Sequence, residues 1–308
     1  MDIIRREIKQ LLVQFEGELG YPGVKGNDYH VVLDGMHQQA TRIDVPYPEG
    51  SASWHAFNLG TNYALLCYPK LPLEVRVYTG ILTWLGVIID DAAAKDPEEW
   101  YQFIPRFHAA AGHPDNGLAQ EFDRWLRLTY RYYSLTVANF IVSSWLDFVN
   151  TSALEGSDVP RVTRTAGGQN WPYYLRMKNS IAEGYAWMTF PKEICPDVPC
   201  YIEAVADMSK YIAFVNDVFS FYKEECACET DNYMHTRTFY EDVGVLGVLK
   251  KVIKESLDAH RRISLVLEGK EPYMGLWLDH ALGYVGMHTT SERYRLLDLG
   301  LSESLPKS

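Results

Sequence analysis

Residues 73–91 read LEVRVYTGILTWLGVIIDD, and this stretch decides the fold class. Apolar side chains recur at steps of three and four residues, as at Val77, Ile81 and Trp84, and few polar residues interrupt them before the Asp-Asp pair at 90–91. A helix that is apolar nearly all round has to be surrounded by other structure. The stretch therefore predicts a helix buried in the middle of a bundle, with two carboxylates at its end.

Helical periodicity continues through most of the sequence beyond this stretch. We expect helices over 97–110, 118–149, 173–188, 199–225, 239–267 and 273–288, with a turn at 111–117 and a loop at 151–172. Convincing strand alternation is lacking. No Pro, Gly and Ser-rich linker separates two apolar halves, and no repeat recurs at a fixed period. The sequence therefore predicts an all-α bundle in a single domain over 1–308.

The two ends of the chain differ from this helical body. Segment 17–56 is rich in Gly, Pro, His and Asp and keeps no period, so we expect residues 1–56 to wrap irregularly over the surface. We expect the tail 302–308, SESLPKS, to be disordered. The first ten residues carry charges at short intervals, unlike a secretion signal, and this favours the cytosol.

The composition excludes several classes of protein. The 308 residues are 47% hydrophobic and 22% charged, which is typical of a globular protein with a sizeable core. A net charge of −11 would repel the phosphates of a nucleic acid. Because no run approaches 18 uncharged apolar residues, we expect no membrane span. Five cysteines without paired spacing indicate reduced thiols.

The sharpest chemical pattern is VNDVFSFYKEE at 215–225. At 100° per residue, its side chains at Asn216, Ser220, Lys223 and Glu224 fall within an arc of ~100° on one helix face. An amide oxygen, a hydroxyl and a carboxylate therefore lie together beside an ammonium group. Hard oxygen donors of this kind suit Mg²⁺. A polar, solvent-exposed helix end is the alternative interpretation.

The Asp-Asp pair is a second candidate for a metal site. Asp90 and Asp91 end a helix, where the helix dipole is already negative, so two carboxylates are unfavourable there without a cation. Mg²⁺ would supply that cation. A solvated acidic helix end is again the alternative.

Together these motifs resemble those of class I terpene cyclases. The pattern NDxxSxxxE, with Asn216, Ser220 and Glu224 at its metal positions, follows an acidic helix end that contains Asp90 and Asp91. The stretch NDVFSFYKE is similar to the fungal trichodiene synthase branch in particular. The resemblance implies a class I terpene synthase bundle with a central apolar cavity. It also implies that these five residues bind Mg²⁺, three ions in the family, that hold a substrate diphosphate.

The resemblance covers roughly residues 75–296 and implies hydrogen-bond donors for the diphosphate, three of them cationic. Arg176 lies 40 residues before Asn216, at the position of the family's diphosphate-sensing arginine. Asn179 and Ser180 take the linker and effector positions of a helix break. The four implied donors are Arg176, Lys223, Arg293 and Tyr294, the last two matching a terminal Arg-Tyr pair.

The acidic motif departs from the family pattern DDxxD. Positions 93 and 94, where the last carboxylate would stand, are both alanine, and Asp96 lies six residues beyond Asp90. Asp96 also precedes Pro97, where a new helix should begin and where Asp is a good N-cap. We therefore expect Asp90 at the metal and Asp96 in the cap.

The resemblance implies a Mg²⁺-dependent sesquiterpene cyclase. It would ionise farnesyl diphosphate, cyclise the allylic cation to a hydrocarbon or an alcohol, and release diphosphate. Two alternatives stay open: a chain-elongating prenyl diphosphate synthase, which would use two aspartate-rich motifs, and a non-catalytic helical isoprenoid-binding protein, which would need no metal face. The resemblance favours a homodimer. The residues that could belong either to the core or to the cavity wall are Trp84, Trp187, Phe214, Phe219 and Tyr284.

Overall fold

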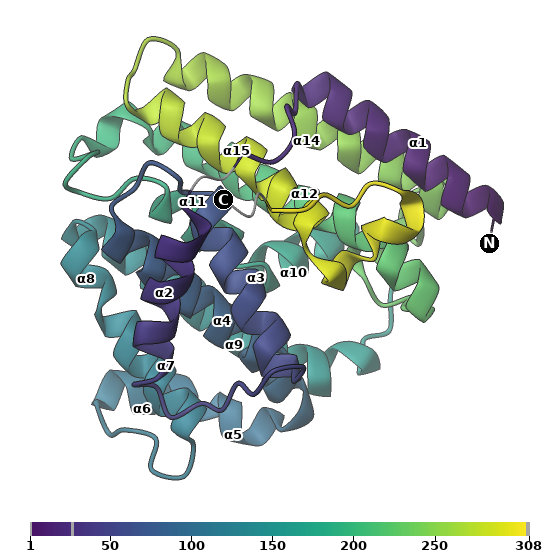
Figure 1. Ribbon diagram of the computed structural model, residues 1–308. Coiled ribbons are helices and arrows are strands. Elements are labelled where there is room, and N and C mark those ends of the chain that lie inside the picture. The colour runs from purple at the N-terminus through teal and green to yellow at the C-terminus, as the bar shows by residue number, and fades with distance from the viewer. Residues whose placement is uncertain (1, 26–27, 306–308) are drawn as a thin grey trace.

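The computed structural model describes residues 2–25 and 28–305, and every regular element in these ranges is a helix (Figure 1). The long helices are α1 (Asp2–Leu19), α2 (Tyr29–Ala40), α3 (Ala52–Leu66), α4 (Leu73–Lys95), α9 (Leu135–Ser157), α12 (Val205–Ala227), α14 (Val245–Leu267) and α15 (Tyr273–Thr290). The short ones are α5 (Pro97–Tyr101), α6 (Phe103–Ala109), α7 (Gly117–Arg127), α8 (Thr129–Tyr132), α10 (Trp171–Asn179), α11 (Ala182–Met188) and α13 (Tyr233–Thr238). Five 3₁₀ turns join them: η1 (Val159–Arg161), η2 (Val198–Cys200), η3 (Ile202–Ala204), η4 (Glu292–Tyr294) and η5 (Leu296–Leu299). The prediction of an all-α bundle is confirmed.

Helix α4 lies inside the bundle, as its sequence predicts. It packs against α3 on one side and α9 on the other (Figure 1). The side chains of Ile81, Trp84 and Leu85 are fully buried. Among the described residues, α4 is also the one helix long and apolar enough to cross a membrane by length and composition. Most of that apolar stretch is buried within the protein, as expected for a core helix.

Two glycines allow α3 and α4 to approach each other closely. A Cβ atom at Gly60 of α3 would lie 2.3 Å from the carbonyl oxygen of Gly80 in α4. A Cβ atom at Gly80 would lie 2.9 Å from the carbonyl oxygen of Gly60. Both distances are shorter than carbon–oxygen contacts allow, so the two backbones touch only because neither residue has a side chain.

The expectation of an irregular wrap over 1–56 is wrong. Most of the described part is helical in α1, α2 and the start of α3. Helix α1 buries a narrow stripe that includes Ile8 and Leu12, and it lies along α14 (Figure 1). Helix α2 buries Val32 and Met36 at four-residue spacing. The exposed faces also contain apolar residues, Val13 in α1 and Val31 in α2, and these obscure the buried stripes in the sequence.

The tail prediction falls partly outside the structure and is wrong for the part inside it. Residues 306–308 lie outside the described residues. Within 302–305, the carboxylate of Glu303 accepts hydrogen bonds from the hydroxyl of Tyr21 at 2.6 Å and from that of Thr289 at 2.7 Å. These bonds attach the end of the chain to α15 and to the α1–α2 connection.

The predicted helix over 118–149 contains a break. Tyr133 and Ser134 are both extended, between α8 and α9. The ring of Tyr133 is buried and its hydroxyl donates to the carbonyl oxygen of Met188 at 3.0 Å, so a contact remote in sequence favours the break. Helix α9 then continues into segment 151–172, whose first seven residues are helical rather than a loop.

Other helices also begin or end at residues that differ from the predicted ones. The predicted helix over 97–110 is two helices, α5 and α6, and that over 173–188 is α10 and α11 with a break between them. The start of 199–225 forms 3₁₀ turns before α12, and α14 begins later than the predicted 239–267. Helix α13 lies outside every predicted helix. The helix over 273–288 is confirmed as α15.

The contact between Gly60 and Gly80 makes the packing of α3 on α4 testable. Gly60→Ala should lower the free energy of unfolding by about 1–3 kcal/mol, because the new methyl group has to push the α4 backbone away. Gly17→Ala in α1 is the matched control. Nothing lies within 4 Å of the added carbon there, and the variant should gain roughly 0.5–1 kcal/mol from helix propensity. Denaturant unfolding measures both, and a Gly60→Ala protein as stable as the wild type would contradict the packing argument.

Candidate active site

A cavity, called here the main cavity, opens beside the C-terminal half of α4. Its charged lining residues are Asp90, Arg176 and Arg293. Asp90 and Arg293 keep exposed surface, whereas Tyr63 and Tyr284 are buried, so the charged end faces solvent and the aromatic end lies inside. The apolar and aromatic lining residues are Leu59, Tyr63, Val87, Phe148, Ile181, Tyr185, Ile212, Ala213, Tyr284, Met287 and Tyr294.

Stacked tyrosines form the inner wall of the main cavity. The rings of Tyr63 and Tyr185 stack with centroids 4.4 Å apart, and the ring of Tyr284 meets Tyr63 edge-on at 5.7 Å. The hydroxyls of Tyr185 and Thr83 form a hydrogen bond at 2.8 Å. Of the five aromatic residues left undecided from sequence, Tyr284 lines this wall, and the other four are buried away from it. Sequence reasoning missed Tyr63 and Tyr185.

Arg176 of α10 is the most highly connected side chain of the site. Its Nε donates to the carboxylate of Asp217 at 2.9 Å, and its Nη2 donates to the side-chain oxygen of Asn216 at 3.0 Å and to the carbonyl oxygen of Ala213 at 3.1 Å. Its Nη1 donates to the side-chain oxygen of Asn179 at 3.1 Å. The guanidinium group therefore joins α10 to α12, beside the amide that the motif assigns to a metal.

Asp217 is a member of the site to which sequence reasoning gave no role. Burial raises its pKa to about 6, although Arg176 acts in the opposite direction. Its neighbour Asn216 points about 100° away on the helix, and the guanidinium group of Arg176 donates to both side chains. The sequence signal is the Asp of the NDxxSxxxE motif itself, a carboxylate beside Asn216 that needs a partner once it is buried.

A second, smaller cavity, called here the acidic pocket, adjoins the main cavity. Arg176, Asn179 and Asn216 line both cavities, so they form the partition between them. The carboxylates that line the acidic pocket are Glu155, Asp217, Glu224 and Asp231. An aromatic compartment and an anionic compartment thus share one polar wall.

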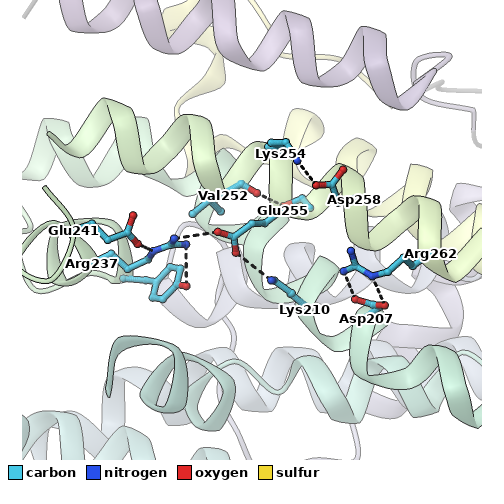
Figure 2. Close-up of polar contacts among 11 residues, drawn as sticks. Asp207, Lys210, Arg237, Glu241, Val252, Lys254, Glu255, Asp258 and Arg262 are labelled. Carbon is cyan, nitrogen blue, oxygen red and sulfur yellow. Dashed lines mark hydrogen bonds and ion pairs between the residues drawn. The ribbon is translucent and has the colours of Figure 1, made fainter. Parts of the chain in front are cut away.

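Helix α13 covers one side of the acidic pocket, where Tyr233 is a lining residue. Figure 2 shows how this helix is held: Arg237 donates to Glu241 on one side and to Glu255 of α14 on the other. Glu255 also pairs with Lys210 of α12 at 3.1 Å. This network ties α13 to both long helices and fixes the outer wall of the pocket.

Asp90 lies at the opening of the main cavity, but protein atoms surround its carboxyl group. Although it keeps exposed surface at the opening, atoms of the cavity walls desolvate the carboxyl group and raise its pKa. The hydroxyl of Ser152 donates to Asp90 at 3.1 Å, and this bond and the charge of Arg293 act in the opposite direction. A cation bound beside Asp90 would also favour the ionised carboxylate and so offset its desolvation.

The α12 motif presents oxygen donors of the kind that Mg²⁺ prefers. Asn216 and Glu224 line the acidic pocket, and Ser220 lies between them on the same face. The Ser220 hydroxyl is buried and has no hydrogen-bond partner among the described residues. An orphaned buried hydroxyl is costly unless a ligand satisfies it. Within the described ranges, no three His, Cys, Asp or Glu side chains cluster as a metal site, so a metal ion bound here would have to use the amide and the hydroxyl as well.

Not every implied residue lies in a cavity wall. Asp91 is exposed, and neither it nor Lys223 lines the two cavities. The ammonium group of Lys223 lies 3.9 Å from the carboxylate of Glu224. Asp96 lies outside both walls, and its side chain accepts a hydrogen bond from the backbone N–H of Glu99, which confirms it as the N-cap of α5.

The break between α10 and α11 faces the main cavity. Asn179, Ser180 and Ile181 all line it, and the Ser180 hydroxyl accepts a hydrogen bond from the backbone of Ala182 at 3.3 Å. Ile181 has a φ of 54°. A left-handed conformation costs a residue with a Cβ atom roughly 1–2 kcal/mol. The break therefore stores strain at the wall of the cavity, where such strain is typical of functional sites.

Comparison with known proteins agrees with this architecture. The sequence profile of the family described as trichodiene synthase (TRI5) matches residues 54–304. Longiborneol synthase CLM1 of Gibberella zeae is 34% identical over 290 residues, which are 92% of this chain and 84% of that protein. Terpene synthase BipA of Cochliobolus sativus is 33% identical over 283 residues, covering 91% and 86% of the two chains.

Solved structures with the same fold are much more distant in sequence. The linalool/nerolidol synthase of Streptomyces clavuligerus superposes with a TM-score of 0.68 at 9% identity, over 87% of this chain and 99% of that chain. A hedycaryol synthase in complex with nerolidol gives a TM-score of 0.64 at 13% identity, over 87% and 96%. The fold is that of class I terpene synthases. With most of its length matched by the family profile, the chain belongs to the trichodiene synthase family of terpene synthases.

Proposed function

We propose that this terpene synthase acts on farnesyl diphosphate with Mg²⁺ and forms a cyclic sesquiterpene, a hydrocarbon or an alcohol, with release of diphosphate. The observation that carries the proposal is the shared wall of Arg176, Asn179 and Asn216 between the main cavity and the acidic pocket. An isoprenoid diphosphate has an apolar chain and an anionic head, and these two parts match the two compartments.

In this proposal Asn216, Ser220 and Glu224 of α12 hold Mg²⁺ from one side, and Asp90 and Asp91 of α4 hold it from the other. The unpartnered Ser220 hydroxyl and the desolvated Asp90 carboxyl group support this assignment, because each lacks a sufficient partner within the protein. When bound, Mg²⁺ neutralises a diphosphate and polarises its leaving oxygen. The donors are oxygen atoms throughout, as Mg²⁺ requires.

The cationic and phenolic side chains receive the departing diphosphate. Arg293 and Tyr294 line the main cavity, and Lys223, which lies outside both cavity walls beside Glu224, would have to turn toward the diphosphate to donate to it. Donors fixed in place before the reaction stabilise the charge that develops on the leaving oxygen. The donors of Arg176 are bonded to protein acceptors in this structure, so diphosphate has to replace some of those acceptors.

The tyrosine wall then acts on the allylic cation. The rings of Tyr63, Tyr185 and Tyr284 offer π faces that attract a cation without forming a bond to it. Closing the charged end over the diphosphate keeps water from the cation until the ring has formed. Loss of a proton then gives a hydrocarbon, and capture of water gives an alcohol. A homodimer and a cytosolic location stay predictions from the sequence.

Incubation of the purified protein with geranyl, farnesyl and geranylgeranyl diphosphate tests the proposal. Gas chromatography of an organic extract should reveal a cyclic C15 product from farnesyl diphosphate that disappears with EDTA and returns with added Mg²⁺. Full activity in EDTA would contradict the metal mechanism. A longer diphosphate formed after addition of isopentenyl diphosphate would favour a prenyl synthase, and binding without turnover would favour a non-catalytic protein.

The irregular acidic motif gives a second prediction. Asp90→Asn should abolish most cyclisation, because it replaces the carboxylate at the opening of the main cavity with a neutral amide, which binds Mg²⁺ more weakly. Asp96→Asn is the matched control: Asn is also a good N-cap, so α5 should lose less than about 1 kcal/mol and activity should stay near that of the wild type. Steady-state kinetics at saturating Mg²⁺ decides the matter, and an inactive Asp96→Asn beside an active Asp90→Asn would reverse the assignment.

Arg293 and Arg295 form a matched pair of exposed arginines for a third prediction. Arg293 lines the main cavity, whereas Arg295 pairs with Asp298 at 2.8 Å. Arg293→Gln should lower kcat by roughly 10²-fold, the scale for losing one fixed donor to a developing anion. Arg295→Gln should leave kcat unchanged. Equal effects of the two substitutions, measured with farnesyl diphosphate, would exclude a direct role for Arg293.

A further inference from the structure

The end of α9, expected to be a loop, lies between the two halves of the proposed site. Gly156 brings this end close to α4: a Cβ atom there would lie 2.2 Å from the carbonyl oxygen of Ala94. Only a glycine permits such an approach. The turn of α9 over 152–156 is therefore pressed against the acidic end of α4.

Side chains from this turn of α9 form hydrogen bonds to two other helices, α4 and α10. Ser152 donates to the carboxylate of Asp90 in α4 at 3.1 Å. Glu155, three residues later and so on the same face, accepts a hydrogen bond from the side-chain N–H of Asn179 in α10 at 2.6 Å. One turn of helix thus contacts a proposed metal carboxylate and the helix break at the same time.

The bond to Glu155 orients the amide of Asn179. An amide has a donating nitrogen on one side and an accepting oxygen on the other. The carboxylate of Glu155 accepts a hydrogen bond from the amide nitrogen of Asn179. The guanidinium group of Arg176, which can only donate, donates to the amide oxygen at 3.1 Å. Arg176 in turn donates to Asn216 at 3.0 Å. A chain of three hydrogen bonds leads from α9 to the proposed metal ligand on α12.

We propose that Glu155 is a positioning residue for diphosphate binding, acting through Asn179 on Arg176. This inference rests on the proposed function and adds to it a residue that neither the motifs nor the comparisons assign. Glu155 lines the acidic pocket, and one of its carboxylate oxygens is committed to Asn179. Without that oxygen the amide of Asn179 is free to rotate and Arg176 loses a fixed acceptor. The guanidinium group is then less well placed to meet a diphosphate.

Two substitutions test the chain of hydrogen bonds. Glu155→Leu removes the acceptor, and Asn179→Asp puts two carboxylates against each other. The double variant Glu155→Gln with Asn179→Asp restores a bond with donor and acceptor exchanged, and keeps an oxygen for Arg176. The control is Asp147→Asn, which removes the partner of Lys178 in another α9–α10 contact that does not touch Arg176.

Two measurements are made on each variant. The rise in unfolding temperature caused by Mg²⁺ with inorganic diphosphate reports diphosphate binding, and kcat and KM with farnesyl diphosphate report catalysis. Glu155→Leu and Asn179→Asp should each weaken diphosphate binding by about 10–100-fold, the usual cost of losing a group that orients a ligand. The double variant should recover most of that loss. Asp147→Asn should behave as the wild type in diphosphate binding.

The outcomes separate this inference from the proposed function. If the wild type neither binds diphosphate nor converts farnesyl diphosphate, the proposed function fails. If the wild type does both and Glu155→Leu binds diphosphate equally well, only the positioning role fails. Should Glu155→Leu not fold, the double variant decides, because it retains a hydrogen bond at that position: a double variant no better than Asn179→Asp would overturn the inference.

Discussion

The candidate site is organised around the largely buried guanidinium group of Arg176. Arg176 cannot lose its charge, so every donor it keeps inside the protein needs an acceptor. Asp217, Asn216 and Asn179 supply these acceptors from two helices, and removing one partner of such a buried pair is costly. The requirement fixes how α10 meets α12 and holds the break after Asn179 in place. The partition between the aromatic and anionic compartments follows from this arrangement.

The fold could be predicted where helices are apolar on several faces. Helix α4 and the helix over 273–288 were predictable because burial on all sides leaves a strong pattern in sequence. Helices α1 and α2 bury narrower stripes than α4, and each also carries an exposed valine, Val13 in α1 and Val31 in α2, so their buried faces are less evident from sequence. The break at Tyr133 depends on a bond to Met188, 55 residues away. A local pattern does not encode a partner at that distance, and such boundaries follow from packing rather than propensity.

The candidate site was predictable to the extent that one helix carries it. The spacing within α12 places Asn216, Ser220 and Glu224 on one face regardless of what covers them. It gives no account of Glu155, whose partner comes from another helix. Nor does it identify the tyrosine wall, because a ring on a buried face has the same sequence signature whether it meets a neighbour or a cavity. Family resemblance supplied Arg176, Arg293 and Tyr294, which periodicity alone would have left as ordinary surface residues.

The tyrosine wall also explains how a cation could survive beside so many nucleophilic groups. A phenolate would capture a carbocation, but burial raises the pKa of Tyr63, Tyr185 and Tyr284 far above neutrality, so these rings stay protonated. The hydroxyl of Tyr185 is further held by Thr83. Four carboxylates lie in the acidic pocket, beyond the partition formed by Arg176, Asn179 and Asn216, and Asp90 lies at the opening of the main cavity. In the proposed reaction a cation in the main cavity would meet neutral π faces, and the anions that could trap it, Asp90 included, would lie on the side where metal and diphosphate neutralise them.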